Sequence, residues 1–184
     1  MCAAPFVRRD RTERAWTEHL ATNVGARALL AAVRRAELPQ HITATLDELL
    51  VALDAETTLD EFGAADPRPT HRVIHQLHLA GKYPDVAIND RYDRLFAVIE
   101  AQRGPADDHH IAKLAADYVP RSGAQLGILV AEGWRRSSAS HPAWASCAAP
   151  IAVVVALDTA PEPDYQVAWV HYPVGGDCDH DEPA

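Results

Sequence analysis

Hydrophobic residues recur at helical spacing over the first two-thirds of the chain. The clearest case follows a capping-box sequence at residues 45–48, after which leucines stand at i, i+3, i+4 and i+7 from Leu46. Further amphipathic stripes, each bounded by Pro, Gly or a capping residue, predict helices over 11–36, 70–81, 90–103 and 105–120. The pattern therefore predicts an N-terminal helical layer of about five helices.

After Gly123 the pattern changes to short runs rich in β-branched and aromatic residues. Residues 125–134, 150–158 and 164–172 each predict a strand. A turn between the last two runs would make them antiparallel neighbours. The expected pairs are Leu157 with Tyr165, Val155 with Val167, Val153 with Trp169 and Ile151 with His171. Helices followed by a three-stranded antiparallel meander define an α+β fold.

A length of 184 residues suits one domain with short extensions. We expect a flexible N-terminus over 1–10 and a single α+β domain over 11–173, helical at 11–120 and sheet-forming at 123–172. The acidic segment 174–184 is typical of a disordered tail.

Composition narrows the class of protein. With 48% hydrophobic and 23% charged residues, the chain reads as an ordinary soluble protein. Its net charge of -9 argues against broad nucleic-acid binding, which needs basic surface. A secretion signal and a membrane-spanning apolar run are not seen. The cysteines, Cys2, Cys147 and Cys178, are widely spaced without CxxC, so we expect reduced thiols and a cytoplasmic location.

Three histidines form the first candidate site. His71, His75 and His78 stand at i, i+4 and i+7, on one side of the helix predicted over 70–81. A pair at i, i+4 can chelate Zn or Fe, but His71 and His78 would be about 10.5 Å apart along the axis, so two would bind with other ligands. The alternatives are a half-buried edge of the helix and a patch that responds to pH.

Glu132 and His171 form the second candidate site, because both fall on the large-residue face of the predicted sheet. Together they would make an acid–base pair for proton transfer, or complete a metal site. The competing interpretation places both at solvated strand ends. A third candidate, Cys178-Asp179-His180-Asp181, carries zinc-ligand types at a spacing too tight for the usual structural sites.

Part of the chain is similar to known sequences. The segment from Leu126 to Trp134, the loop Ser140-His141-Pro142 and the run 153–158 resemble small uncharacterised proteins of actinobacteria and their phages. In those proteins a strand ends in Glu-x-Trp, a loop carries His-Pro, and a valine-rich strand ends in an acidic turn. The resemblance covers residues 123–172 and implies a strand–loop–strand order. It differs after His-Pro, where charged residues give way to Ala143-Trp144.

These observations support two hypotheses of function. The first is a small cytoplasmic interaction or regulatory module, derived from a mobile element, that binds a protein partner and holds no cofactor. An exposed Trp144 with His141 would form its surface, since Trp is favoured at binding hot spots. The second is a metal-dependent enzyme. Its residues would come from His71, His75, His78, Glu132 and His171. A phosphate-binding glycine loop, a GxSxG elbow and a dinucleotide fingerprint are not seen, which argues against nucleotide-dependent and serine-hydrolase chemistry.

Overall fold

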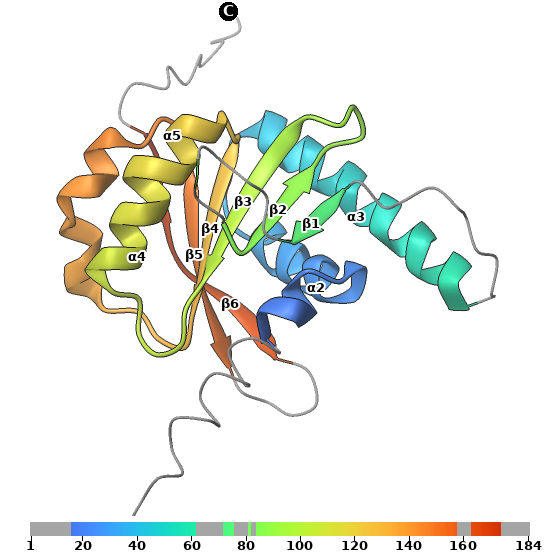
Figure 1. Cartoon of the computed structure of the whole chain (residues 1–184), viewed down its shortest axis with the longest axis horizontal. Helices are drawn as coiled ribbons and strands as arrows, with labels where there is room; N and C mark the ends of the chain where they lie inside the picture. Colours follow the sequence, from blue (N-terminus) through green and yellow to red (C-terminus); the bar gives the residue numbers. More distant parts are fainter. Residues whose placement is uncertain (1–15, 62–71, 76–80, 82–83, 158–162, 174–184) are drawn as a thin grey trace, which may run out of the picture.

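In the computed structural model of the protein, the described residues are 16–61, 72–75, 81, 84–157 and 163–173, without the side chains of 56–61. They form one six-stranded mixed sheet with helices on both faces (Figure 1). None of the described helices combines the length and apolar character needed to cross a membrane.

The strands lie in the sheet in the order of the chain, β1 to β6. The first three, β1, β2 and β3, are antiparallel neighbours. β3, β4 and β5 are parallel, and β6 closes the sheet antiparallel to β5. Their bounds are β1 Val73–His75, β2 Val86–Asn89, β3 Leu95–Ala101, β4 Leu126–Ala131, β5 Ile151–Leu157 and β6 Asp164–His171.

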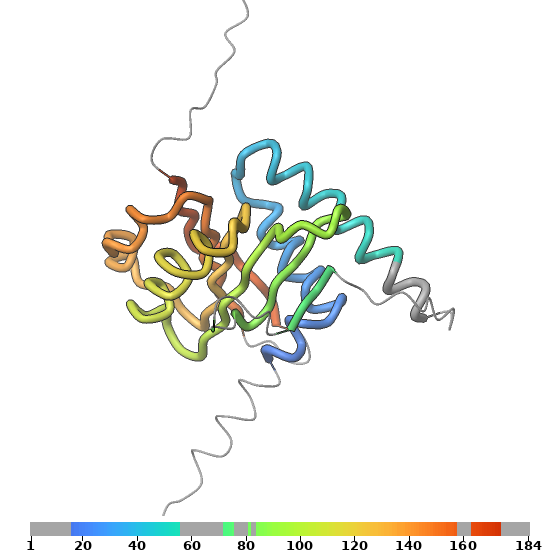
Figure 2. Tube along the Cα trace, turned by 45° about the horizontal axis from the view of Figure 1, so that its top comes forward, coloured from blue at the N-terminus to red at the C-terminus, as the bar shows by residue number. Residues whose placement is uncertain are grey.

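Helices α2 (Asn23–Arg34) and α3 (Gln40–Glu61) cover one face of this sheet (Figure 2). The helix expected over 11–36 is interrupted before α2, where the hydroxyl of Thr22 accepts a hydrogen bond from the Gly25 N–H at 3.0 Å. The helix expected after the capping box is present, but it begins earlier, at Gln40.

The opposite face is covered by a continuous helical segment of three parts. These are α4 (Asp108–Ala112), the π-helix η1 (Lys113–Tyr118) and α5 (Val119–Ser122), which ends at Gly123 with φ 68°. The segment agrees with the helix expected over 105–120, although Pro120 does not end it. Between β4 and β5, two 3₁₀ helices, η2 (Arg136–Ser140) and η3 (Pro142–Ser146), cover the same face.

The central strand β3 is buried on both sides. Ala97 and Ile99 join the core beneath α2 and α3, whereas Val98 packs toward α4 and η1. Glu100 alternates with Ile99 and therefore faces the α4 side. A strand buried on both faces reads as a nearly continuous apolar run.

The predicted fold class was wrong. The described residues form a six-stranded mixed sheet, and two segments expected to be helical, around 73–75 and 95–101, are strands. The run at 95–101 misled the prediction because apolar residues at i, i+1, i+3 and i+4 fit either a helix or a doubly buried strand. The expected helix cap is instead a hairpin turn, in which the Asp90 carboxylate accepts from the Tyr92 and Arg94 N–H groups at 2.8 and 3.0 Å.

The expected register of the last hairpin was half right. Ile151 pairs with His171, and Val153 with Trp169, as predicted. A bulge after Val153 then shifts the pairing by one residue, so Val155 lies opposite Gln166. The predicted meander also placed β4 beside β5 as antiparallel strands, but they are parallel because the η2–η3 connection crosses over one face of the sheet.

Candidate functional site

Two carboxylates lie side by side where β2 begins and β3 ends. Val86 pairs with Ile99 across these strands, so Asp85 lies opposite Glu100. Oδ2 of Asp85 accepts a hydrogen bond from the Ala101 N–H at 2.8 Å, which fixes its carboxylate against β3. Both acids lie at the edge where the parallel strands have their carboxyl ends, the usual place for ligands in such sheets.

Glu100 is buried without full compensation. Its side chain is 2% exposed, and its Oε2 atom has no hydrogen-bond partner among the described residues. Burial, together with the negative charge of Asp85, raises the pKa of Glu100 to about 7. Burial also raises the pKa of Asp85. A cation bound by Asp85 and Glu100 would therefore stabilise their ionised forms.

Lys113 supplies one positive charge to this site. Its Nζ atom donates a hydrogen bond to Oε1 of Glu100. Burial lowers the pKa of Lys113, but its bonds to Glu100 and Tyr118 outweigh that effect and leave the pKa above its ordinary value. Lys113 and Tyr118 are the first and last residues of the π-helix, a geometry often found at functional sites.

Two histidines lie near the carboxylates. Burial raises the pKa of both Asp85 and Glu100, and a positive charge on His110, on α4, opposes part of that increase. A positive charge on His75, at the end of β1, acts in the same way on Asp85. These histidines therefore oppose the effect of burial without cancelling it, since the pKa of both acids is still raised.

The donor set fits a hard divalent cation. Two neighbouring carboxylates, with the other positions left to water and substrate, are the usual protein contribution to a Mg²⁺ site. The unpartnered oxygen of Glu100 is the atom that such an ion would satisfy. Among the described residues no group of three or more His, Cys, Asp or Glu side chains forms a closed metal cage, so the candidate site is an open one.

The predicted histidine helix is replaced by a strand where the structure describes it. His75 ends β1 and is exposed, and its neighbourhood includes Asp85 rather than a helical stripe. His71 and His78 lie outside the described residues, as does the Cys178–Asp181 segment. Of the three histidines, the structure therefore places His75 near the carboxylate site.

Glu132 and His171 are not brought together. His171 pairs with Ile151, which pairs with Gly127, so His171 is level with the start of β4. Glu132 follows the other end of that strand, roughly 16 Å away at 3.3 Å per residue. Its Oε2 accepts from the Gly104 N–H at 2.8 Å. The predicted acid–base pair is therefore absent from this structure.

His171 instead belongs to a cluster of aromatic rings, which we call the tryptophan cluster: Trp134, Trp144, Trp169 and His171. Neighbouring ring centroids within it are 5.0–5.9 Å apart. Burial lowers the pKa of His171, and its hydrogen bond to the backbone of Trp144 partly opposes this.

Trp144 is buried, contrary to the expectation that it is exposed. Its exposed fraction is 4%, and its Nε1–H donates to the Ser138 carbonyl at 2.8 Å. Nδ1 of His141 accepts from the Ala143 N–H at 3.1 Å, so this side chain caps η3. Both residues stabilise the η2–η3 connection, and Trp144 does not form an exposed interaction surface.

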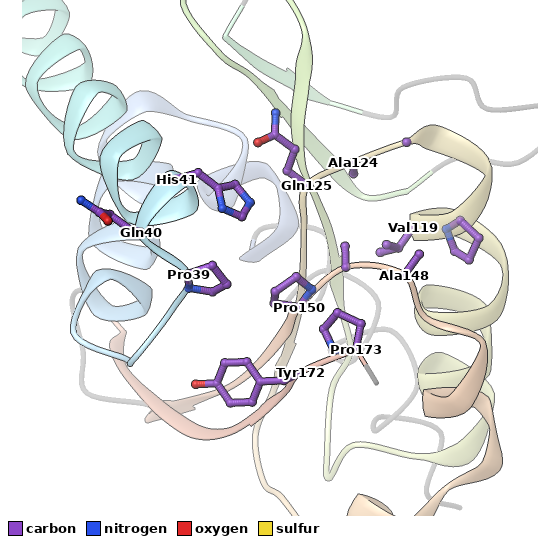
Figure 3. A pocket seen from close by; sticks show the side chains of 13 residues that line it. Pro39, Gln40, His41, Val119, Ala124, Gln125, Ala148, Pro150, Tyr172 and Pro173 are labelled. Carbon is purple, nitrogen blue, oxygen red and sulfur yellow. The ribbon is translucent and has the colours of Figure 1, made fainter. Parts of the chain in front are cut away.

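A pocket lies at the opposite edge of the sheet, where β4 and β5 begin (Figure 3). It has a volume of about 810 Å³ and is lined mainly by proline, alanine and neutral polar residues. In Figure 3, His41 and Pro39 from the start of α3 face Pro150 across it, and Tyr172 lies below. It lacks carboxylates among its lining residues, so it offers no comparable chemistry.

The sequence analysis did not single out Asp85, Glu100 or Lys113. A helix over 90–103 would place Glu100 among ordinary polar positions. In a strand, the same residue is an acid within the buried run 95–101, and Asp85 directly precedes another buried run at 86–88. The signal was an acid inside one apolar strand and another directly before a second one, and it becomes visible once the strands are recognised.

Comparisons with known proteins do not place the chain in a family. No family model matches the sequence, and neither the curated proteins nor the solved structures give a significant match. The resemblance of residues 123–172 to actinobacterial and phage proteins stays a prediction.

Proposed function

We propose that this protein is a divalent-metal-dependent enzyme that hydrolyses phosphodiesters. Asp85 and Glu100 would hold Mg²⁺ or Mn²⁺, and Lys113 would contact the substrate phosphate. The observation that supports this most is the pair of adjacent carboxylates with a buried, unpartnered oxygen on Glu100. The proposal keeps the metal-dependent class of the second hypothesis and moves the site to β2 and β3.

The charges of the site favour a diester over a monoester. A divalent cation and the Lys113 ammonium together carry one more positive charge than two carboxylates carry negative charge. That excess matches the single negative charge of a phosphodiester. Mg²⁺ held by one or two carboxylates commonly completes its coordination with substrate phosphate oxygens, and lysine is a common phosphate-binding residue.

Each residue of the chain has a separate task in this proposal. Asp85, fixed by the Ala101 N–H, and Glu100, fixed by Lys113, would each supply a carboxylate oxygen to the cation. Lys113 stays protonated, since its pKa is raised, and so stabilises negative charge on the phosphate instead of removing a proton. When bound, the metal would act as a Lewis acid and lower the pKa of water.

Nucleic acid is one source of phosphodiesters. The net charge of -9 argues against broad nucleic-acid binding. Four acidic residues of the segment 177–182 contribute to that charge and lie far along the chain from the carboxylate site. Lys113 places a positive charge directly beside Glu100. A site of this kind would contact few phosphates, and its binding would depend weakly on salt.

Metal binding tests the proposal directly. Isothermal titration calorimetry at pH 8 should show Mg²⁺ or Mn²⁺ binding to the wild type. Loss of an outer-shell partner typically weakens metal binding by roughly 10–100-fold. Asp85→Asn and Glu100→Gln each remove a proposed direct ligand, so each should weaken the metal affinity by at least that factor. Asp164→Asn, at an exposed acid that begins β6, is the matched control and should bind as the wild type does.

Cleavage assays with duplex DNA, single-stranded DNA, RNA and bis-p-nitrophenyl phosphate would identify the source of the diester. Activity should require the added metal and be lost in both carboxylate variants. A wild type that binds no divalent cation, or variants that bind as well as the wild type, would show that the two acids are not a metal site. Metal binding without hydrolysis of any of these diesters would reject the reaction and keep the metal site.

A further inference from the structure

Asp107 and His110 form a hydrogen-bonded pair beside the carboxylate site. Oδ1 of Asp107 lies 2.8 Å from Nδ1 of the His110 ring and also accepts the His110 backbone N–H at 2.9 Å. Burial raises the pKa of Asp107, but its bonds to His110 outweigh this, so the carboxyl is ionised. The pair fixes the ring so that Nδ1 carries the hydrogen toward Asp107, and Nε2 is left on the other side.

The position of His110 relates it to both metal-ligand candidates. It lies three residues before Lys113, so the two side chains share a face of the helix that covers β3. Its charge acts on Glu100 and on Asp85. Its side chain is 24% exposed, which leaves the ring accessible to a substrate at the edge of the sheet.

The proposed reaction needs a group that protonates the leaving oxygen. Lys113 is engaged with Glu100 and Tyr118. Tyr118 is 3% exposed, and burial raises its pKa. His75 acts on Asp85, but no carboxylate among the described residues is hydrogen-bonded to its ring. Among these described groups, His110 combines access, an orienting carboxylate and proximity to both acids.

We propose that His110, oriented by Asp107, is the general acid of this site. The inference rests on the proposed phosphodiester hydrolysis. Water forms the new P–O bond and releases its proton to solvent, and the bond between phosphorus and the leaving oxygen breaks. The leaving oxygen keeps the electron pair and takes the Nε2 proton of the His110 imidazolium. Solvent then protonates the neutral imidazole again.

The test compares two leaving groups. The first substrate is an oligonucleotide that the wild type cleaves, and the second carries sulfur in place of the leaving oxygen at the cleaved linkage. A thiolate leaves without protonation. His110→Gln should therefore slow the oxygen substrate by about 100-fold or more, and it should cleave the sulfur substrate at nearly the wild-type rate. Mg²⁺ binding should be retained, which shows that the variant is folded.

His41→Gln is the control, since His41 is an exposed histidine that lines the pocket at the opposite edge of the sheet. It should cleave both substrates as the wild type does. Equal slowing of both substrates by His110→Gln would overturn the general-acid role, and so would no slowing of either. A wild type that cleaves no phosphodiester, despite binding metal, would reject the proposed function and this inference with it.

Discussion

Lys113 donates a hydrogen bond to one oxygen of Glu100, and the other oxygen of this buried carboxylate has no partner among the described residues. A half-compensated carboxylate is costly to bury, because the remaining oxygen loses its hydration without replacement. The free energy of folding should therefore depend on pH, on the lysine and on added metal, and each dependence can be measured separately.

The metal-free protein should lose stability as pH rises from about 4.5 to about 7. The ordinary pKa of a glutamate is 4.5, and burial raises that of Glu100 to about 7, so the folded state holds the proton more tightly. The resulting stabilisation is complete below the unfolded pKa and disappears as pH rises through the folded one. The raised pKa of Asp85 acts in the same direction. Urea unfolding in EDTA across this range measures the effect, and Glu100→Gln should flatten it.

Mg²⁺ should stabilise the wild type more at pH 8 than at pH 6. Protons compete with the cation for Glu100 below its folded pKa of about 7. The increase in Tm on addition of Mg²⁺ should therefore grow with pH. An increase of the same size at both pH values, or the same increase in Asp85→Asn, would contradict binding at these acids.

Lys113→Met should lower the free energy of unfolding by about 3 kcal/mol at pH 8, because it leaves a buried charge unpaired. At pH 5 the loss should be smaller, since Glu100 is then protonated. The double variant Lys113→Met/Glu100→Gln should recover part of the stability. Urea unfolding of the wild type, of Lys113→Met, of Glu100→Gln and of the double variant forms the cycle. A double variant less stable than Lys113→Met would show that the ammonium stabilises the fold through other contacts.

Trp144→Ala should lower the free energy of unfolding by about 3 kcal/mol or more, as expected for a buried tryptophan. Val51→Ala is the control, because Val51 is 71% exposed and should change stability by under about 0.5 kcal/mol. Denaturation at pH 7 compares the two. If both variants changed stability by the same small amount, Trp144 would instead be exposed, as the interaction-module hypothesis expects.

Gly127→Ala should destabilise the protein by about 1–3 kcal/mol through overpacking between β4, β5 and α5. An added Cβ would lie 2.8 Å from Cγ2 of Val119 and 2.9 Å from Cγ1 of Ile151. Gly133→Ala is the control, since its nearest contacts would be at 3.7 Å. The double variant Gly127→Ala/Val119→Ala should lose less stability than the sum of the two single variants, because it removes one of the two close contacts, and thermal unfolding measures the difference.

The sequence predicted the elements whose pattern has one interpretation. Helix α3 carries leucines at helical spacing, and β4, β5 and β6 are long and β-branched, so their positions were found. The register of β6 was right up to the bulge at Val153, because a bulge has no simple signature in an alternating pattern.

The rest depended on contacts that pattern alone does not give. The run 95–101 is apolar on both faces, and its identity as a strand is decided by pairing with β2 and β4. The carboxylate site was missed because of that error. If β3 is read as a helix, Asp85 and Glu100 do not lie opposite each other. Lys113 reaches Glu100 through a π-helix, which spacing rules for α-helices do not anticipate.

The π-helix also has a consequence for how this site could be gained or lost in evolution. Its wider turn holds one residue more than an α-helical turn, so deletion of one residue between Lys113 and Tyr118 would restore regular α-helical hydrogen bonding. The helix on one side of the deletion would then turn by about 100° relative to the other. Relatives that differ by this single deletion would keep the sheet and lack the lysine–tyrosine contact, and the chemistry could change without a change of fold.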